Sequence, residues 1–130
     1  CSSDYKQVEI ISDIQNMGNS KIISDEDTLE STIFGNKSYT ELVSTIKLDD
    51  LRIFDVSLIK IDVEGHEKHC LDGAIETILR CKPMLWIESH TNKFIEEFSH
   101  YIQYKLVWSD SSINYILCPL GNTSQRVVYL

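Results

Sequence analysis

Three carboxylates and an imidazole follow directly after an apolar segment near the middle of the chain. Residues 57–67 read SLIKIDVEGHE, in which the apolar run gives way to Asp62, Glu64, His66 and Glu67. Carboxylate and imidazole groups are the side chains that most often move protons in enzymes. Their position indicates a binding or catalytic site, provided that the apolar segment is a strand that ends there.

A second polar group ends the next apolar segment. Residues 84–88 read MLWIE, and Glu88 is followed by Ser89 and His90. In open sheets of parallel strands, ligands bind outside the carboxyl ends of the strands, where neighbouring strand ends meet. We therefore expect five side chains to face one crevice, namely Asp62, Glu64, His66, Glu88 and His90.

Some of these residues also have a purely structural explanation. The carboxylate of Glu64 could cap the following helix, because the N–H groups and the dipole at a helix amino terminus favour negative charge. His90 could be a general base or a polar support for another side chain. Gly65 fits an unusual backbone angle or the close approach of a ligand. Asp62 lies so close to the buried strand that its carboxylate needs a partner or a ligand.

The spacing of histidines and cysteines does not match a metal site. The segment GHEKHC resembles the HExxH zinc motif, but His69 comes one residue too early after His66. No CxxC pair occurs among the four cysteines, which are Cys1, Cys70, Cys81 and Cys118. We therefore predict no metal site, and we interpret the cysteines as thiols of a reducing compartment, which predicts a cytoplasmic protein.

Composition argues against two classes of partner. The 130 residues carry a formal net charge of -8, whereas a nucleic-acid surface needs clustered Lys and Arg. No apolar run approaches the roughly 20 residues that a membrane-spanning helix requires. A chain of this length forms one domain at most, and its 42% hydrophobic content is sufficient for a core.

The elements that must position these side chains alternate between strand and helix. The predicted order is strand 57–63, helix 64–82, strand 84–88, helix 92–102, and strands 104–108 and 113–118. Such alternation is typical of an α/β layer with parallel strands and right-handed crossovers, closed here by an antiparallel strand pair. We expect strand 57–63 to be buried on both faces, and Trp86 and Trp108 to lie in the core.

Residues 1–46 have a weaker pattern and are expected to form an irregular or hairpin segment before an α/β core at residues 47–130. Strands are predicted at residues 7–11 and 21–24, with a turn at the Asn-Met-Gly-Asn of residues 16–19. β-branched residues predict a strand at 39–47, followed by one helical turn at 48–51. Residues 24–35 are predicted as a loop, and residues 125–130 as a final strand or a tail.

Several of these segments together resemble a known family. IKIDVEGHE, the helix with LDGA and the strand KPMLWIE are similar to the signature of the FkbM-type methyltransferases. TIKLDDL at residues 45–51 and INYILCP at residues 113–119 are similar to segments that flank this signature. The pieces occur in the family's order at plausible spacings.

The resemblance implies a Rossmann-like fold and methyl transfer from S-adenosylmethionine, typically to a hydroxyl group of a sugar or natural product. Residues 57–63 would be the fourth strand, beside the cofactor-binding strand, so that Asp62, Glu64 and Glu88 contact the cofactor. Transfer to oxygen requires alignment and loss of the hydroxyl proton. We predict Asp62 and His66 first for this catalytic role, with Glu64 and His90 next.

The resemblance covers the carboxyl-terminal portion of the family domain. The family begins with a strand and a glycine-rich turn that hold the cofactor, whereas all five glycines of this chain are isolated. We therefore expect residues 1–130 to be a single partial domain with an open sheet edge, which a second copy or another partner covers. The alternative is a non-catalytic α/β interaction module derived from a methyltransferase.

Overall fold

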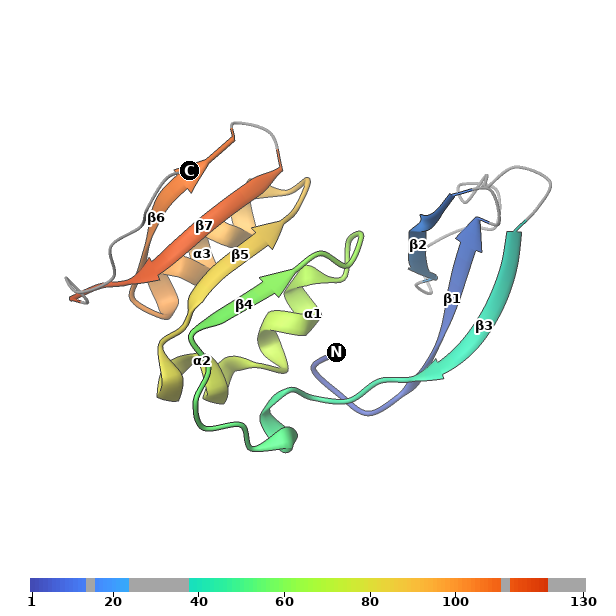
Figure 1. The fold of residues 1–130 in the computed structure, drawn as a ribbon, viewed down its shortest axis with the longest axis horizontal. Helices are drawn as coiled ribbons and strands as arrows, with labels where there is room; N and C mark the ends of the chain where they lie inside the picture. The colour runs from blue at the N-terminus through green and yellow to red at the C-terminus, as the bar shows by residue number, and fades with distance from the viewer. Residues whose placement is uncertain (14–15, 24–37, 111–112, 122–130) are drawn as a thin grey trace. The chain divides into compact units, whose positions relative to one another are not determined.

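The computed structural model describes residues 1–13, 16–23, 38–110 and 113–121 (Figure 1). The chain divides into two compact units. The first unit comprises residues 1–52 and 63–75, and the second comprises residues 53–62 and 76–130. Among the described residues, no helix is long and apolar enough to cross a membrane. The predicted loop at 24–35 and the predicted strand or tail at 125–130 lie outside the described residues, and the prediction of a single partial domain stays a prediction.

The second unit is built on a four-stranded sheet. Its strands are β4 (Leu58–Ile61), β5 (Met84–Glu88), β6 (Tyr104–Ser109) and β7 (Asn114–Pro119), in the order β4-β5-β7-β6 (Figure 1). β4 and β5 are parallel, whereas β5-β7 and β6-β7 are antiparallel. The helices are α2 (Ile75–Cys81) and α3 (Asn92–Tyr101). This confirms a mixed α/β architecture with a closing antiparallel pair.

The core of the second unit lies on one face of this sheet. Alternate strand residues are buried there, including Leu85 and Ile87 of β5 and Leu117 of β7. Ile78 of α2 and Ile95 of α3 are buried to the same degree, and α3 lies behind the sheet in Figure 1. Burying such side chains stabilises the fold by about 1.5–3 kcal/mol each. This core fixes β4 and β5 side by side, which positions the residues at their ends.

The opposite face of the sheet is exposed, contrary to expectation. Trp86 and Trp108 keep 39% and 38% of their surface accessible, and Leu58 keeps 52%. The predictions of a strand buried on both faces and of two core tryptophans are therefore wrong. The reason is the twofold alternation of a strand, which turns Trp86 away from its buried neighbours Leu85 and Ile87.

The first unit contains an antiparallel sheet of order β2-β1-β3. Its strands are β1 (Gln7–Asp13), β2 (Asn16–Ile23) and β3 (Ser38–Ser44), and the helical turn η1 (Asp49–Leu51) follows. The predicted strands and the helical turn are present. The predicted turn at residues 16–19 is wrong, because these residues form the first half of β2. Pairing with β1 across Asp13 and Asn16 overrides the local turn preference of Asn and Gly.

The single helix predicted at residues 64–82 is divided in two. α1 spans Glu67–Asp72, and α2 begins at Ile75. At the break, Ala74 N donates to Leu71 O, three residues back, at 3.0 Å. A Cβ atom on Gly73 would lie 1.9 Å from Ser2 O, so the helix can bend here only because residue 73 has no side chain and the amino-terminal segment packs against it.

Candidate functional site

Asp62 and Glu88 lie at the carboxyl ends of two neighbouring parallel strands, β4 and β5. Ile61, the last residue of β4, is paired with Ile87 of β5. The residue that follows each of them is therefore a carboxylate, and paired strands lie about 4.8 Å apart. Lys60 Nζ donates to Asp62 Oδ2 at 2.8 Å. That hydrogen bond, with the attraction of Asp62 and Glu88, raises the pKa of Lys60. The second unit thus places Asp62 and Glu88 at the ends of neighbouring strands, with Lys60 near both carboxylates.

Lys60 also connects this edge to an exposed indole. Its Nζ lies 5.4 Å from the ring centroid of Trp86, in cation–π geometry. Trp86 Nε1 donates to Asn114 Oδ1 at 2.9 Å, and Asn114 Nδ2 donates to Asp110 Oδ2 at 2.8 Å. Polar contacts on both sides therefore hold Trp86 in one orientation on the sheet surface.

His90 lies in the loop that leaves β5, two residues beyond Glu88. The preceding Ser89 is buried, and its N donates to Ile113 O at 2.7 Å. Ser89 Oγ accepts a hydrogen bond from Thr91 N at 3.2 Å. These contacts fix the backbone on both sides of His90, whose side chain is exposed. His90 is thus available to a ligand at the end of β5.

Glu64 occupies a tight turn between β4 and α1. His66 N donates to Val63 O at 3.3 Å, and the two central residues, Glu64 and Gly65, have φ angles of 49° and 97°. A left-handed glutamate is uncommon, and such backbone conformations concentrate at functional sites. Within this turn, Glu67 Oε1 accepts a hydrogen bond from Gly65 N at 2.7 Å. The turn leaves Glu64 exposed at its tip.

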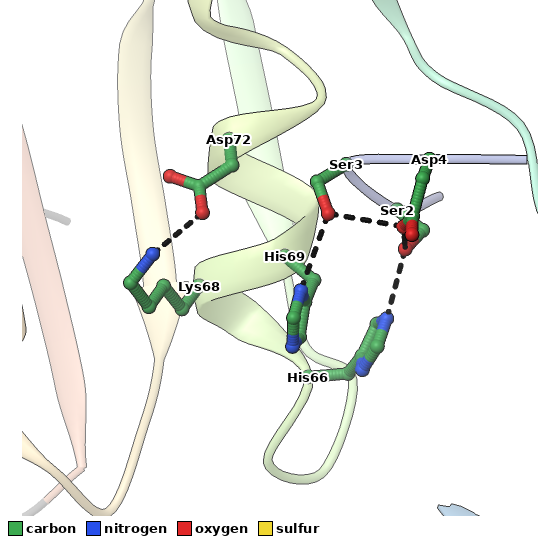
Figure 2. A network of polar contacts seen from close by, with 7 residues as sticks. All are labelled: Ser2, Ser3, Asp4, His66, Lys68, His69 and Asp72. Atoms are coloured by element: carbon green, nitrogen blue, oxygen red, sulfur yellow. Dashed lines mark hydrogen bonds and ion pairs between the residues drawn. The ribbon is translucent and has the colours of Figure 1, made fainter. Parts of the chain in front are cut away.

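His66 is directed into the first unit, against the start of the chain (Figure 2). Its ring stacks on His69 with a centroid separation of 4.5 Å, and its Nε2 lies 3.3 Å from Ser2 Oγ. The Ser2 hydroxyl donates its single proton to Asp4 Oδ1 at 3.2 Å, so Nε2–H of His66 is the donor to Ser2. Burial first, and then the charge of His69, lowers the pKa of His66 to about 4. The imidazole is therefore neutral at pH 7.

His69 completes this network on the side of Ser3. Ser3 Oγ lies 3.3 Å from His69 Nδ1 and 3.1 Å from Asp4 Oδ1. Hydrogen bonding by Ser3 is the main cause that lowers the pKa of Asp4. The structure therefore brings Asp62 and Glu88 together in the second unit, and His66 together with Ser2 and His69 in the first.

Two groups of residues escaped the sequence analysis. Lys60 precedes Asp62 by two positions on a strand, so alternation already places both on the same face, and this signal was available. The contact of His66 with Ser2 joins residues 64 positions apart, and no local pattern indicates it. Within the described parts of the chain, no group of three or more His, Cys, Asp or Glu side chains is arranged to hold a metal ion.

A comparison of the chain with models of protein families agrees with the FkbM-type signature found in the sequence. Residues 3–114 match the model of the methyltransferase FkbM domain. No curated protein and no solved structure matches the chain. The match extends over most of the chain and includes both strand ends with their carboxylates. The chain therefore belongs to the FkbM methyltransferase family.

Proposed function

We propose that this member of the FkbM family is an S-adenosylmethionine-dependent O-methyltransferase whose acceptor is a hydroxyl group of a sugar or natural product. Family membership supports methyl transfer. The observation that carries the more specific proposal is the pair of carboxylates, Asp62 and Glu88, at the ends of paired parallel strands. This is the edge at which open α/β sheets bind ligands.

The residues present suit the cofactor in chemical type. S-adenosylmethionine carries a sulfonium and an ammonium group, and carboxylates are the natural acceptors and counter-charges for such a ligand. Asp62 and Glu88 supply two negative charges against the single positive charge of Lys60. Asp62 and Glu88 of the second unit would hold the cofactor, which supplies an electrophilic methyl group when bound.

The role of the chain's own residues is to position the acceptor and remove its proton. We assign the proton to Asp62, because its carboxylate is exposed at the strand end and Lys60 fixes the position of Oδ2. Glu88 and His90 would orient the acceptor hydroxyl from the end of β5. A role for His66 as the base is disfavoured, because the ring is buried against Ser2 and has a pKa of about 4. A better role for His66 is to hold the turn that carries Glu64.

The test is methyl transfer from radiolabelled S-adenosylmethionine to a panel of sugars and polyols by the full chain. Asp62→Asn should lower kcat by about 10²–10⁴-fold, the usual contribution of a general base. The matched control is Asp72→Asn, since Asp72 is also an exposed aspartate paired with a lysine, Lys68. Activity of the Asp62 variant equal to that of the control would remove Asp62 from the mechanism.

The second candidate function is a non-catalytic interaction module, favoured by the exposed tryptophans of the sheet. Calorimetric titration with S-adenosylmethionine and with S-adenosylhomocysteine separates the two functions. Binding that weakens in Glu88→Gln supports the enzyme. A correctly folded chain that binds neither ligand at millimolar concentration supports the module.

A further inference from the structure

Two of the four cysteines meet in the first unit, although 69 positions separate them in the sequence. Cys70 Sγ donates a hydrogen bond to Cys1 O at 3.1 Å, and Cys1 Sγ lies 3.9 Å from Cys70 O. Each thiol therefore lies against the backbone of the other residue. Both are free thiols, and neither belongs to the site at the ends of β4 and β5.

The residue that follows Cys1 holds it in this position. Ser2 is fully buried, and its N donates to Ile46 O at 2.9 Å. A Cβ atom on Gly73 would lie 1.9 Å from Ser2 O, and the Ser2 hydroxyl lies 3.3 Å from His66 Nε2 (Figure 2). Contacts on three sides thus fix the start of the chain along α1, which carries the second cysteine.

The other two cysteines have different surroundings, in the second unit. Cys81 Sγ lies 3.8 Å from Ile53 O, and Cys118 is buried in β7, where it is paired with Lys105. A single buried cysteine usually serves as a small apolar side chain. Two thiols in contact have a further property, because a disulfide can join them without unfolding the chain.

We propose that Cys1 and Cys70 form a redox-active dithiol, which a low-molecular-weight disulfide such as oxidised glutathione converts to an intramolecular disulfide. The bond requires Cβ atoms about 3.8 Å apart and sulfurs about 2.0 Å apart. Cys70 is held within α1, so the Cys1 side chain turns about its Cα–Cβ bond to meet it. The proposal does not depend on methyl transfer, because it rests on contacts within the first unit alone.

The oxidation proceeds by two thiol–disulfide exchange steps. Cys70 is buried, which raises its pKa, so Cys1 meets the oxidant first. The Cys1 thiolate attacks one sulfur of glutathione disulfide, the S–S bond breaks, and one glutathione leaves with the proton that Cys1 gave up. Cys70 then loses its proton and attacks Cys1 Sγ, and the second glutathione leaves with that proton. Two protein thiols are oxidised, and one glutathione disulfide is reduced to two glutathiones.

The test identifies the linked cysteines by mass spectrometry of the full chain. The chain is equilibrated in glutathione buffers of increasing oxidised fraction, and the remaining thiols are alkylated. Trypsin, which cleaves after Lys and Arg except before Pro, places each cysteine on a separate peptide, at residues 1–6, 69–80, 81–93 and 106–126. Peptides 1–6 and 69–80 should become linked, whereas 81–93 and 106–126 should stay alkylated.

Oxidation should also stabilise the first unit, because the disulfide joins residues 69 positions apart. We expect its folding equilibrium constant to rise by about tenfold or more. Urea denaturation of the oxidised and the reduced chain, followed by circular dichroism, measures the shift of the midpoint. Cys1→Ser should remove both the link and the shift, and Cys81→Ser, the control in the second unit, should keep both.

Three results overturn the proposal. Glutathione that stays attached to Cys1, with no link to peptide 69–80, would show that the two thiols cannot meet. Links from Cys1 to peptides 81–93 or 106–126 in equal yield would make the oxidation unselective. A yield of the expected link that is no higher in the folded than in the urea-unfolded chain would show that the fold does not pair these cysteines.

Discussion

At the level of single residues, the structure constrains the charge state of His66. Its ring is 9% exposed, and its neutral form donates to Ser2 while stacking on His69. Its pKa is lowered from 6.5 to about 4. The unfolded chain therefore binds more protons than the folded chain between these two pH values, and stability is lost as the pH falls through this window.

We predict that the free energy of unfolding decreases by about 2 kcal/mol between about pH 7 and about pH 4.5 through His66. Urea denaturation followed by circular dichroism at these two pH values measures the decrease. In His66→Gln, which keeps a donor for Ser2 but does not titrate, most of the decrease should disappear.

His100→Gln is the control for this prediction, because His100 lies exposed near the end of α3. This variant should keep the full pH dependence of the parent chain. A His66→Gln chain with an unchanged pH dependence would show that other groups, such as the carboxylates, cause the acid sensitivity.

Among the elements, the break between α1 and α2 depends on one glycine. We predict that Gly73→Ala destabilises the first unit by about 3 kcal/mol or more, since the added Cβ would overlap a backbone oxygen, Ser2 O, that no rotamer change can move. Thermal or urea unfolding of the variant measures the loss.

Gly65 provides the contrast at the other end of α1. Its φ is 97°, but a Cβ there meets no atom within 4 Å. Gly65→Asn should therefore cost only about 1 kcal/mol or less, since Asn tolerates the left-handed region. If Gly73→Ala is as mild as Gly65→Asn, the amino-terminal segment does not pack on residue 73 as described.

The break between α1 and α2 also shows what hydrophobic periodicity cannot predict about a helix. Apolar residues at helical spacing predicted one helix through residues 64–82, and most of those residues are indeed helical. The start at Glu67 follows from the left-handed Glu64 and Gly65, and the break follows from Ser2. The first cause is local and a glycine marks it, whereas the second is a contact across the sequence.

For the whole molecule, both tryptophans report on the exposed sheet face of the second unit. We predict that acrylamide quenches the native chain with a slope about two-fifths of that of the urea-unfolded chain, because Trp86 and Trp108 keep 39% and 38% of their surface accessible. Stern–Volmer titrations of the native and unfolded chain give the ratio. A native slope near zero would place the tryptophans in a core, as the sequence alone suggested.

The sequence by itself determined the four strands of the second unit to within two residues at each end, and hence that Asp62 and Glu88 lie at the carboxyl ends of two of them. Those features follow from local periodicity and from turn residues, which any short window of the chain displays. It also determined the family, since the signature lies in contiguous segments. The role of each site residue in methyl transfer stays a prediction.

Only the tertiary structure decided which surfaces are covered and which side chains meet. The burial of His66 against Ser2, the break at Gly73 and the exposure of Trp86 all depend on residues distant in sequence. An apolar residue on a strand is suited to burial, but the element that covers it must come from elsewhere in the fold. That is why Leu85 and Trp86, adjacent in one apolar segment, have opposite environments.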